Sequence, residues 1–221
     1  MNISNKGKLI VIEGLDGSGK GTQADYLEKH LKSKNEKFLR INLPDYDSNA
    51  SYPVRMYLKG DFGTNPFDVN PYAASTFFAV DRFASFKTSW QTQYENGYTI
   101  LANRYTTSNI VHHAVKLPKE NWIDFCSWLY DFEFNKIGLP KPDKVIYIDM
   151  DTDISQNLMN NRYNGDQSKK DIHEKDIEYL KKCRQCALYC ADLLDWTVIK
   201  AFNNDRPLSR EDIFSQIKKH F

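Results

Sequence analysis

The chain has 221 residues, which is the size of a single domain with a sizeable core. With 30 basic and 29 acidic residues its net charge is +1, so the composition indicates neither a nucleic-acid-binding surface nor a charged tail. The N-terminal apolar run at residues 9–12 is too short for a signal peptide or a membrane span. We therefore expect a soluble, cytoplasmic protein that binds no nucleic acid and contacts no membrane.

Short apolar runs alternate along the chain with longer segments of helical periodicity. The predicted strands are residues 9–13, 38–43, 98–102, 145–149 and 197–201. The predicted helices are residues 20–34, 53–59, 71–95, 106–116, 119–136, 152–161, 172–195 and 209–219. This alternation predicts one α/β domain over residues 1–221, a three-layer α/β/α fold with a five-stranded parallel sheet and helices on both faces. Ligands bind such sheets beyond the carboxyl ends of the strands.

The stretch "KLIVIEGLDGSGKGTQ" at residues 8–23 carries the clearest chemistry. A strand, a glycine-rich turn and a helix together place backbone N–H groups around an anion, and the lysine adds a positive charge for phosphate. The predicted phosphate-binding residues are Gly14, Gly17, Ser18, Gly19, Lys20, Gly21 and Thr22. Gly21 stands where the usual pattern has Ser or Thr, so the hydroxyl comes one place late. A glycine-rich turn that binds nothing is the alternative.

Three of the four cysteines form a C-x2-C-x3-C pattern at Cys183, Cys186 and Cys190, and Cys126 lies far away in the sequence. This spacing is found in metal and iron–sulfur sites. The surrounding segment has helical periodicity, which places these cysteines near one helix face with apolar neighbours. We favour the interpretation that they pack as small hydrophobic residues in the core.

Four segments in order resemble the thymidylate kinase family over nearly the whole chain. The loop "IEGLDGSGKGTQ" is similar to the phosphate loop of that family, and "GSGKGTQ" also has the form found in adenylate kinases. "FFAVDRFAS" (77–85) is similar to the base-binding helix, and "NRYTTSN" (103–109) to the Asp-Arg-aromatic box. "NRYNGDQSKKDIHE" (161–174) looks like the lid. The resemblance implies a P-loop NTPase fold with a mobile lid at about residues 161–172, with ATP and Mg²⁺ as cofactors.

The resemblance also implies roles for individual residues. The catalytic residues are Lys20, Arg104, Arg162 and Asp16, and the metal residues are Thr22 and Glu13. The residues that bind the acceptor are Asp16, Phe78, Arg82, Arg104, Ser108 and Asn109. Because Phe78 and Arg82 are four positions apart on a helix, they share a face: a pyrimidine stacks on the ring while the guanidinium donates to a base carbonyl. The alternative is a core phenylalanine beside a solvated charge.

Three positions depart from the family pattern. Asn103 replaces the usual Asp of the box, Tyr46 stands where an Arg often clamps phosphate, and His112 replaces an aromatic residue. An asparagine lacks the charge that a carboxylate offers to magnesium. For His112 and its neighbour His113, we favour partly exposed surface over a role in reading sugar or base.

The function that the resemblance implies is transfer of the ATP γ-phosphoryl group to dTMP, which gives dTDP, by a homodimer. Another nucleotide or deoxynucleoside kinase of the same fold is an alternative. A nucleotide-binding regulator that has lost catalysis is the other.

Overall fold

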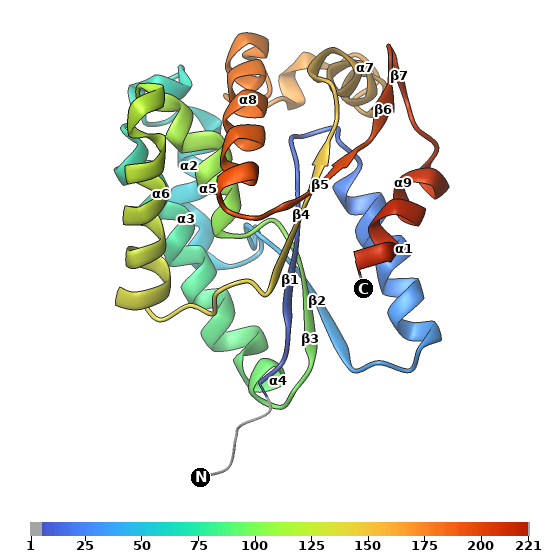
Figure 1. Ribbon diagram of the computed structural model, residues 1–221. Helices are drawn as coiled ribbons and strands as arrows, with labels where there is room; N and C mark the ends of the chain where they lie inside the picture. Colours follow the sequence, from blue (N-terminus) through green and yellow to red (C-terminus); the bar gives the residue numbers. More distant parts are fainter. Residues whose placement is uncertain (1–5, 221) are drawn as a thin grey trace.

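The computed structural model describes residues 6–220, and its centre is a parallel sheet (Figure 1). The strands of this sheet are β1 (Leu9–Glu13), β2 (Phe38–Asn42), β3 (Thr99–Asn103), β4 (Lys144–Asp149) and β5 (Thr197–Lys200). Their order is β2-β3-β1-β4-β5, and each neighbouring pair is parallel. The predicted five-stranded parallel sheet is therefore confirmed. The predicted strand boundaries are correct to within one residue.

Helices cover both faces of the sheet (Figure 1). They are α1 (Lys20–Ser33), α2 (Tyr52–Lys59), α3 (Pro71–Ser85), α4 (Gln91–Glu95), α5 (Thr106–His113), α6 (Trp122–Tyr130), α7 (Thr152–Arg162), α8 (Ile177–Leu193) and α9 (Arg210–Ile217). Ile10 and Ile12 of β1 pack in one apolar cluster with side chains of α1 and α9, while Leu9 and Val11 pack in another with α5, α6 and α8. This alternation follows from the two-residue period of a strand. Within residues 6–220, no helix is long and apolar enough to cross a membrane.

Two predicted helices are interrupted. The segment predicted as one helix over 71–95 contains a π-helical turn at Phe86–Trp90, and the one over 119–136 ends in a π-helical segment at Asp131–Lys136. Such widened turns are common at functional sites. The second of them holds Glu133, whose fully buried carboxylate contacts Arg82.

The helix predicted over 172–195 begins later, at Ile177. The Asp171 carboxylate accepts hydrogen bonds from the backbone N–H groups of His173 and Glu174, which holds the preceding residues in a turn. Asp176 then caps the helix by accepting from the Tyr179 N–H. The sequence pattern does not predict the small hairpin of β6 (Phe202–Asn203) and β7 (Arg206–Pro207), whose turn contains Asn204 with φ 52°.

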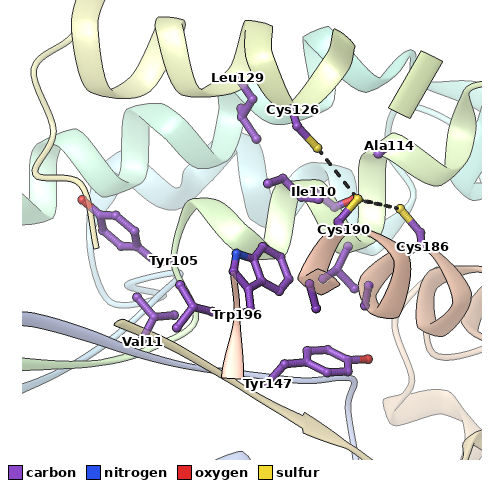
Figure 2. Close-up of a cluster of buried hydrophobic side chains, with 14 of the residues drawn as sticks. Val11, Tyr105, Ile110, Ala114, Cys126, Leu129, Tyr147, Cys186, Cys190 and Trp196 are labelled. Atoms are coloured by element: carbon purple, nitrogen blue, oxygen red, sulfur yellow. Dashed lines mark hydrogen bonds between the residues drawn. The ribbon is translucent and has the colours of Figure 1, made fainter. Parts of the chain in front are cut away.

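The four cysteines lie in the core, as predicted. Cys126 of α6 and Cys186 of α8 contact Cys190, with Sγ–Sγ distances of 3.9 and 4.0 Å, beside Ile110 and Trp196 (Figure 2). All four thiols are free and buried. They therefore fill the space between α5, α6 and α8 as small apolar side chains do.

Candidate active site

The turn between β1 and α1 has the backbone of an anion site. Gly14, Gly17 and Gly19 have φ of 152°, 79° and 91°, values that side chains rarely permit. A Cβ on Gly17 would lie 2.5 Å from the Ser155 carbonyl oxygen, so the loop packs too closely against α7 for a larger residue. No side chain caps the start of α1. Its first N–H groups are thus available to a phosphate.

Two charged side chains stand at this loop. Lys20 is 7% exposed; its Nζ donates to the Leu15 carbonyl oxygen at 2.8 Å and lies 3.6 Å from the Asp16 carboxylate. Burial, together with the nearby Arg104 guanidinium, lowers the pKa of Lys20 to about 8. Although burial favours the neutral acid, Arg104 and Lys20 hold the pKa of the Asp16 carboxyl well below its usual range. The loop therefore holds an ionised carboxylate beside a lysine that is charged at neutral pH.

Arg104 follows β3 directly and has φ 68°, in the left-handed region. Its Nη2 donates to Asp16 at 2.6 Å, and its Nη1 donates to the Ser108 hydroxyl at 3.2 Å. A non-glycine residue in this region costs roughly 1–2 kcal/mol, and such residues cluster at functional sites. The backbone therefore turns the guanidinium of Arg104 back over the phosphate loop.

Two cavities meet at this ion pair. The smaller one, about 430 Å³, is lined by residues 16–23 of the loop together with Arg104, Leu158, Arg162 and the segment 207–213 in part. The larger one, about 560 Å³, is lined by side chains from α2, α3, α5 and the segment 163–175. Asp16 and Arg104 line both cavities. A molecule in one cavity therefore lies next to a molecule in the other.

The smaller cavity brings together the predicted phosphate-binding residues Gly17 to Thr22, whereas Gly14 does not line it and donates its N–H to Glu13. Lys20, Thr22 and Arg162 all line it, and Arg162 is exposed at the C-terminal end of α7. The Ser18 hydroxyl and the Asn103 side-chain oxygen are buried, and neither has a hydrogen-bond partner among the described residues. Both residues line this cavity, so a ligand that fills it can offer these atoms partners.

The larger cavity brings together the residues predicted to bind a base. Phe78 and Arg82 of α3 line it, as do Ser108 and Asn109 of α5. Arg82 is 2% exposed and forms a two-pronged ion pair with Glu133, through Nε at 2.8 Å and Nη2 at 2.6 Å. Its side chain is therefore held against the cavity and is not a solvated charge.

Glu13 lines neither cavity, although its Oε1 lies 3.4 Å from Nη1 of Arg104, which lines both. It is fully buried, and its carboxylate accepts from the Gly14 N–H, the Thr107 hydroxyl and the Ser108 hydroxyl at 2.7–2.9 Å. All of these partners are protein groups that fix the loop to the start of α5. These contacts suit a positioning role, and the metal role of Glu13 stays a prediction.

The prediction that His112 and His113 are surface residues is wrong. They are 6% and 1% exposed and line the larger cavity together with His173. The His112 and His173 rings stack with their centroids 5.2 Å apart, and burial lowers the pKa of all three imidazoles. Two adjacent polar residues carry no periodic signal, and the residues that cover them are distant in sequence. His173 stacks on His112, while Ser75 and Phe78 of α3 contact His113.

Sequence reasoning also missed Glu133. The Arg82–Glu133 contact spans 51 positions, and only an acidic residue inside the apolar stretch "WLYDFEF" hints at it. Arg55 also lines the larger cavity, and its Nη1 donates to the Tyr46 carbonyl oxygen at 2.8 Å.

The sequence is similar to those of several thymidylate kinases. A family model for thymidylate kinase matches residues 12–213. The thymidylate kinase of Schizosaccharomyces pombe is 28% identical over 218 residues, which cover 98% of this chain and 92% of the relative. That of Thermosipho africanus is 29% identical over 209 residues, with 95% and 94% covered. A solved structure of thymidylate kinase from Candida albicans has a TM-score of 0.72 at 23% identity, covers 97% of this chain and 91% of that one, and shows the same fold.

Proposed function

Because this chain belongs to the thymidylate kinase family, we propose that its two cavities are the donor and acceptor sites in which ATP phosphorylates dTMP to dTDP. The observation that carries this assignment is the Asp16–Arg104 pair, which lines both cavities. ATP occupies the smaller cavity, with its phosphates on the loop 14–22. The monophosphate occupies the larger one, with its base toward Phe78 and Arg82 and its phosphate toward Arg104 and Arg55.

The reaction needs alignment and charge more than covalent chemistry. An oxygen of the dTMP phosphate forms a bond to the γ-phosphorus of ATP. The bond from that phosphorus to the β–γ bridging oxygen breaks, and ADP leaves with the electron pair. Lys20 and Arg104 offset the charge on the phosphate oxygens, while Asp16 holds Arg104 in place and accepts from the 3′-hydroxyl of the acceptor.

Arg162 is the proposed mobile cation. The segment Leu15–Ser18 contains no basic side chain, and Arg162 lines the donor cavity from the end of α7. When the lid over residues 161–172 closes, this guanidinium bridges the two phosphates and excludes water from the transfer.

The donor cavity fits a hydrated divalent cation. The orphaned Asn103 oxygen is an acceptor that suits a metal-bound water, and the Thr22 hydroxyl lines the same cavity. We propose that these two side chains hold Mg²⁺ when it arrives with ATP. Bound there, the ion neutralises charge on the phosphate oxygens.

A homodimer is the proposed assembly. Tyr72, Val80 and Phe83 are 43%, 55% and 40% exposed on one side of α3, which is an apolar face suited to a second copy. The cytoplasmic location stays a prediction.

A coupled assay of ADP release over a panel of acceptors tests the function. The panel is dTMP, dUMP, dCMP, AMP and thymidine, each with ATP and Mg²⁺. We expect dTMP to be the best acceptor and dUMP to be slower but active, because one methyl group is worth only roughly 1–3 kcal/mol. Lys20→Ala should abolish turnover in a folded protein, while Lys29→Ala on the exposed side of α1 should not. AMP or thymidine as the best acceptor would instead indicate another kinase of this fold, and no turnover with any acceptor would indicate a regulator.

A further inference from the structure

Glu133 lies behind the wall of the acceptor cavity and is 0% exposed. Its Oε1 accepts from Arg82 Nη2 at 2.6 Å and from Asn109 Nδ2 at 3.3 Å. Its Oε2 accepts from Arg82 Nε at 2.8 Å and from the Thr106 hydroxyl at 2.6 Å. A carboxylate has about four acceptor positions, so every one of them has a partner. This single side chain joins α3 to α5 at the base end of the cavity.

The contacts of Asn109 determine which atom of its amide the cavity sees. Its two N–H groups donate to Glu133 and to the Ser75 carbonyl oxygen, at 3.3 and 3.2 Å. Both partners only accept, so an amide rotated by half a turn would place its oxygen against two acceptors. The Asn109 oxygen is therefore left for a ligand, and it is an acceptor.

The contacts of Arg82 leave hydrogen-bond donors for the cavity. A guanidinium has five N–H groups, and the bonds to Glu133 and to the Tyr105 carbonyl oxygen use three of them. The remaining groups, on Nη1 and Nη2, can only donate. The cavity thus presents one fixed donor and one fixed acceptor.

We propose that Glu133 is a positioning residue that sets this donor–acceptor order and so selects thymine and uracil over cytosine. The proposal rests on the proposed function. The edge of thymine or uracil offers a carbonyl oxygen to Arg82 and an N–H to Asn109. Cytosine offers an amino group and a bare ring nitrogen, so both contacts would be mismatched. Unmatched buried polar groups are costly, which gives the discrimination its strength.

The test compares dCMP with dTMP as acceptors of Glu133→Gln. A glutamine amide can donate to the Asn109 oxygen, so the reversed amide gains a partner and presents an N–H group to the bare ring nitrogen of cytosine. One of the two mismatches is then removed, while the mismatch at Arg82 remains. We expect the ratio of kcat/KM for dCMP over dTMP to rise about tenfold, mainly through the KM of each acceptor. Thr106→Val is the matched control: it removes another donor from the same carboxylate but leaves Asn109 in place, and its ratio should match the parent. If the ratio for Glu133→Gln stays within twofold of the parent ratio, the proposal is overturned. An equal rise of the ratio in Thr106→Val also overturns it. A larger rise that occurs only in Glu133→Gln supports the proposal.

Two further measurements keep the result interpretable. Glu133→Asp serves if the glutamine variant fails to fold. It retains the charge that pairs with Arg82 but is one methylene shorter. A ratio of kcat/KM for dCMP over dTMP within twofold of the parent would again overturn the proposal. Calorimetric binding of dTMP and dCMP gives the same ratio without turnover. If the parent protein binds dTMP in preference to dCMP but phosphorylates neither, the proposed function fails. The role of Glu133 is then decided by the ratio of the two binding affinities in the variants.

Discussion

Arg104 and Asp16 form an ion pair, with an Nη2–Oδ1 distance of 2.6 Å, at the boundary between the two cavities. The pair joins the residue after β3 to the loop after β1, and these strands are neighbours in the sheet. Binding at either cavity therefore acts on the same two charges. Phosphate groups must arrive where a guanidinium is already held in place, which lowers the entropic cost of alignment.

The lowered pKa of Lys20 predicts that the kinetics with ATP depend on pH in the alkaline range. Since this pKa is about 8, the free enzyme loses the ammonium charge as the pH rises through 8. We expect kcat/KM for ATP to fall above this pH, because that constant reports the free enzyme. Measurements from pH 6.5 to 9.5 check it. Lys20→Arg, which stays charged throughout, should show no such fall in whatever activity it retains; a fall that persists there would assign the titration to another group.

Loss of Arg162 should act on the transition state. Arginines that bridge transferring phosphoryl groups are worth about 10³–10⁵ in rate, so Arg162→Ala should lower kcat by at least about 10³ with little change in either KM. Steady-state kinetics with both substrates give the answer. Arg206→Ala on the exposed hairpin strand β7 is the control. A kcat for Arg162→Ala within a few-fold of the parent would leave Arg162 only a minor role at the helix end.

Phe78→Ala should weaken the acceptor and not the donor. Stacking of a base on an aromatic ring is worth roughly 1–3 kcal/mol, so kcat/KM for dTMP should fall about 10–100-fold while KM for ATP stays near its original value. Phe67→Ala, at an exposed position that lines neither cavity, should leave both unchanged. An equal effect of Phe78→Ala on ATP would point to damage of the fold.

Lys116 should make the stability depend on pH. Its Nζ donates to the Tyr57 hydroxyl at 2.8 Å, and burial lowers its pKa to about 7. The unfolded chain keeps this proton up to about pH 10.4, so between pH 7 and 10 the unfolded state binds more protons and the contribution of Lys116 to the free energy of unfolding rises with pH.

Urea unfolding at pH 7 and 9 measures this effect. From pH 7 to pH 9, the unfolding free energy of the parent should rise by about 1–2 kcal/mol relative to that of Lys116→Met, after allowance for solvent screening. Lys119→Met, at an exposed position nearby, should show no shift. A pH-independent difference for Lys116→Met would mean that the ammonium is not desolvated.

Local sequence signals predicted the parts of the site that local structure builds. The loop around Lys20 lies between a strand and a helix that are contiguous in sequence, and Phe78 and Arg82 share a helix face. The cysteine core followed from periodicity within α8. Contacts between distant segments gave no such signal. The sequence around Arg82 does not indicate that Glu133 pairs with it, and the sequence around His112 does not indicate that His173 packs on it. These contacts depend on how helices cross, which a pattern within one helix does not encode.

The left-handed backbone of Arg104 and the ion pairs of its side chain act in opposite directions on thermal stability. Glycine adopts φ near 68° without steric cost, so Arg104→Gly would relieve the roughly 1–2 kcal/mol that an L-residue loses there. It would also remove the guanidinium shared by the two cavities. The carboxylates of Asp16 and Glu13 would then lose the cation that faces them, which costs more than the relieved strain. A directed-evolution library screened only for heat resistance would therefore keep the arginine codon, and phosphate transfer would be retained with it.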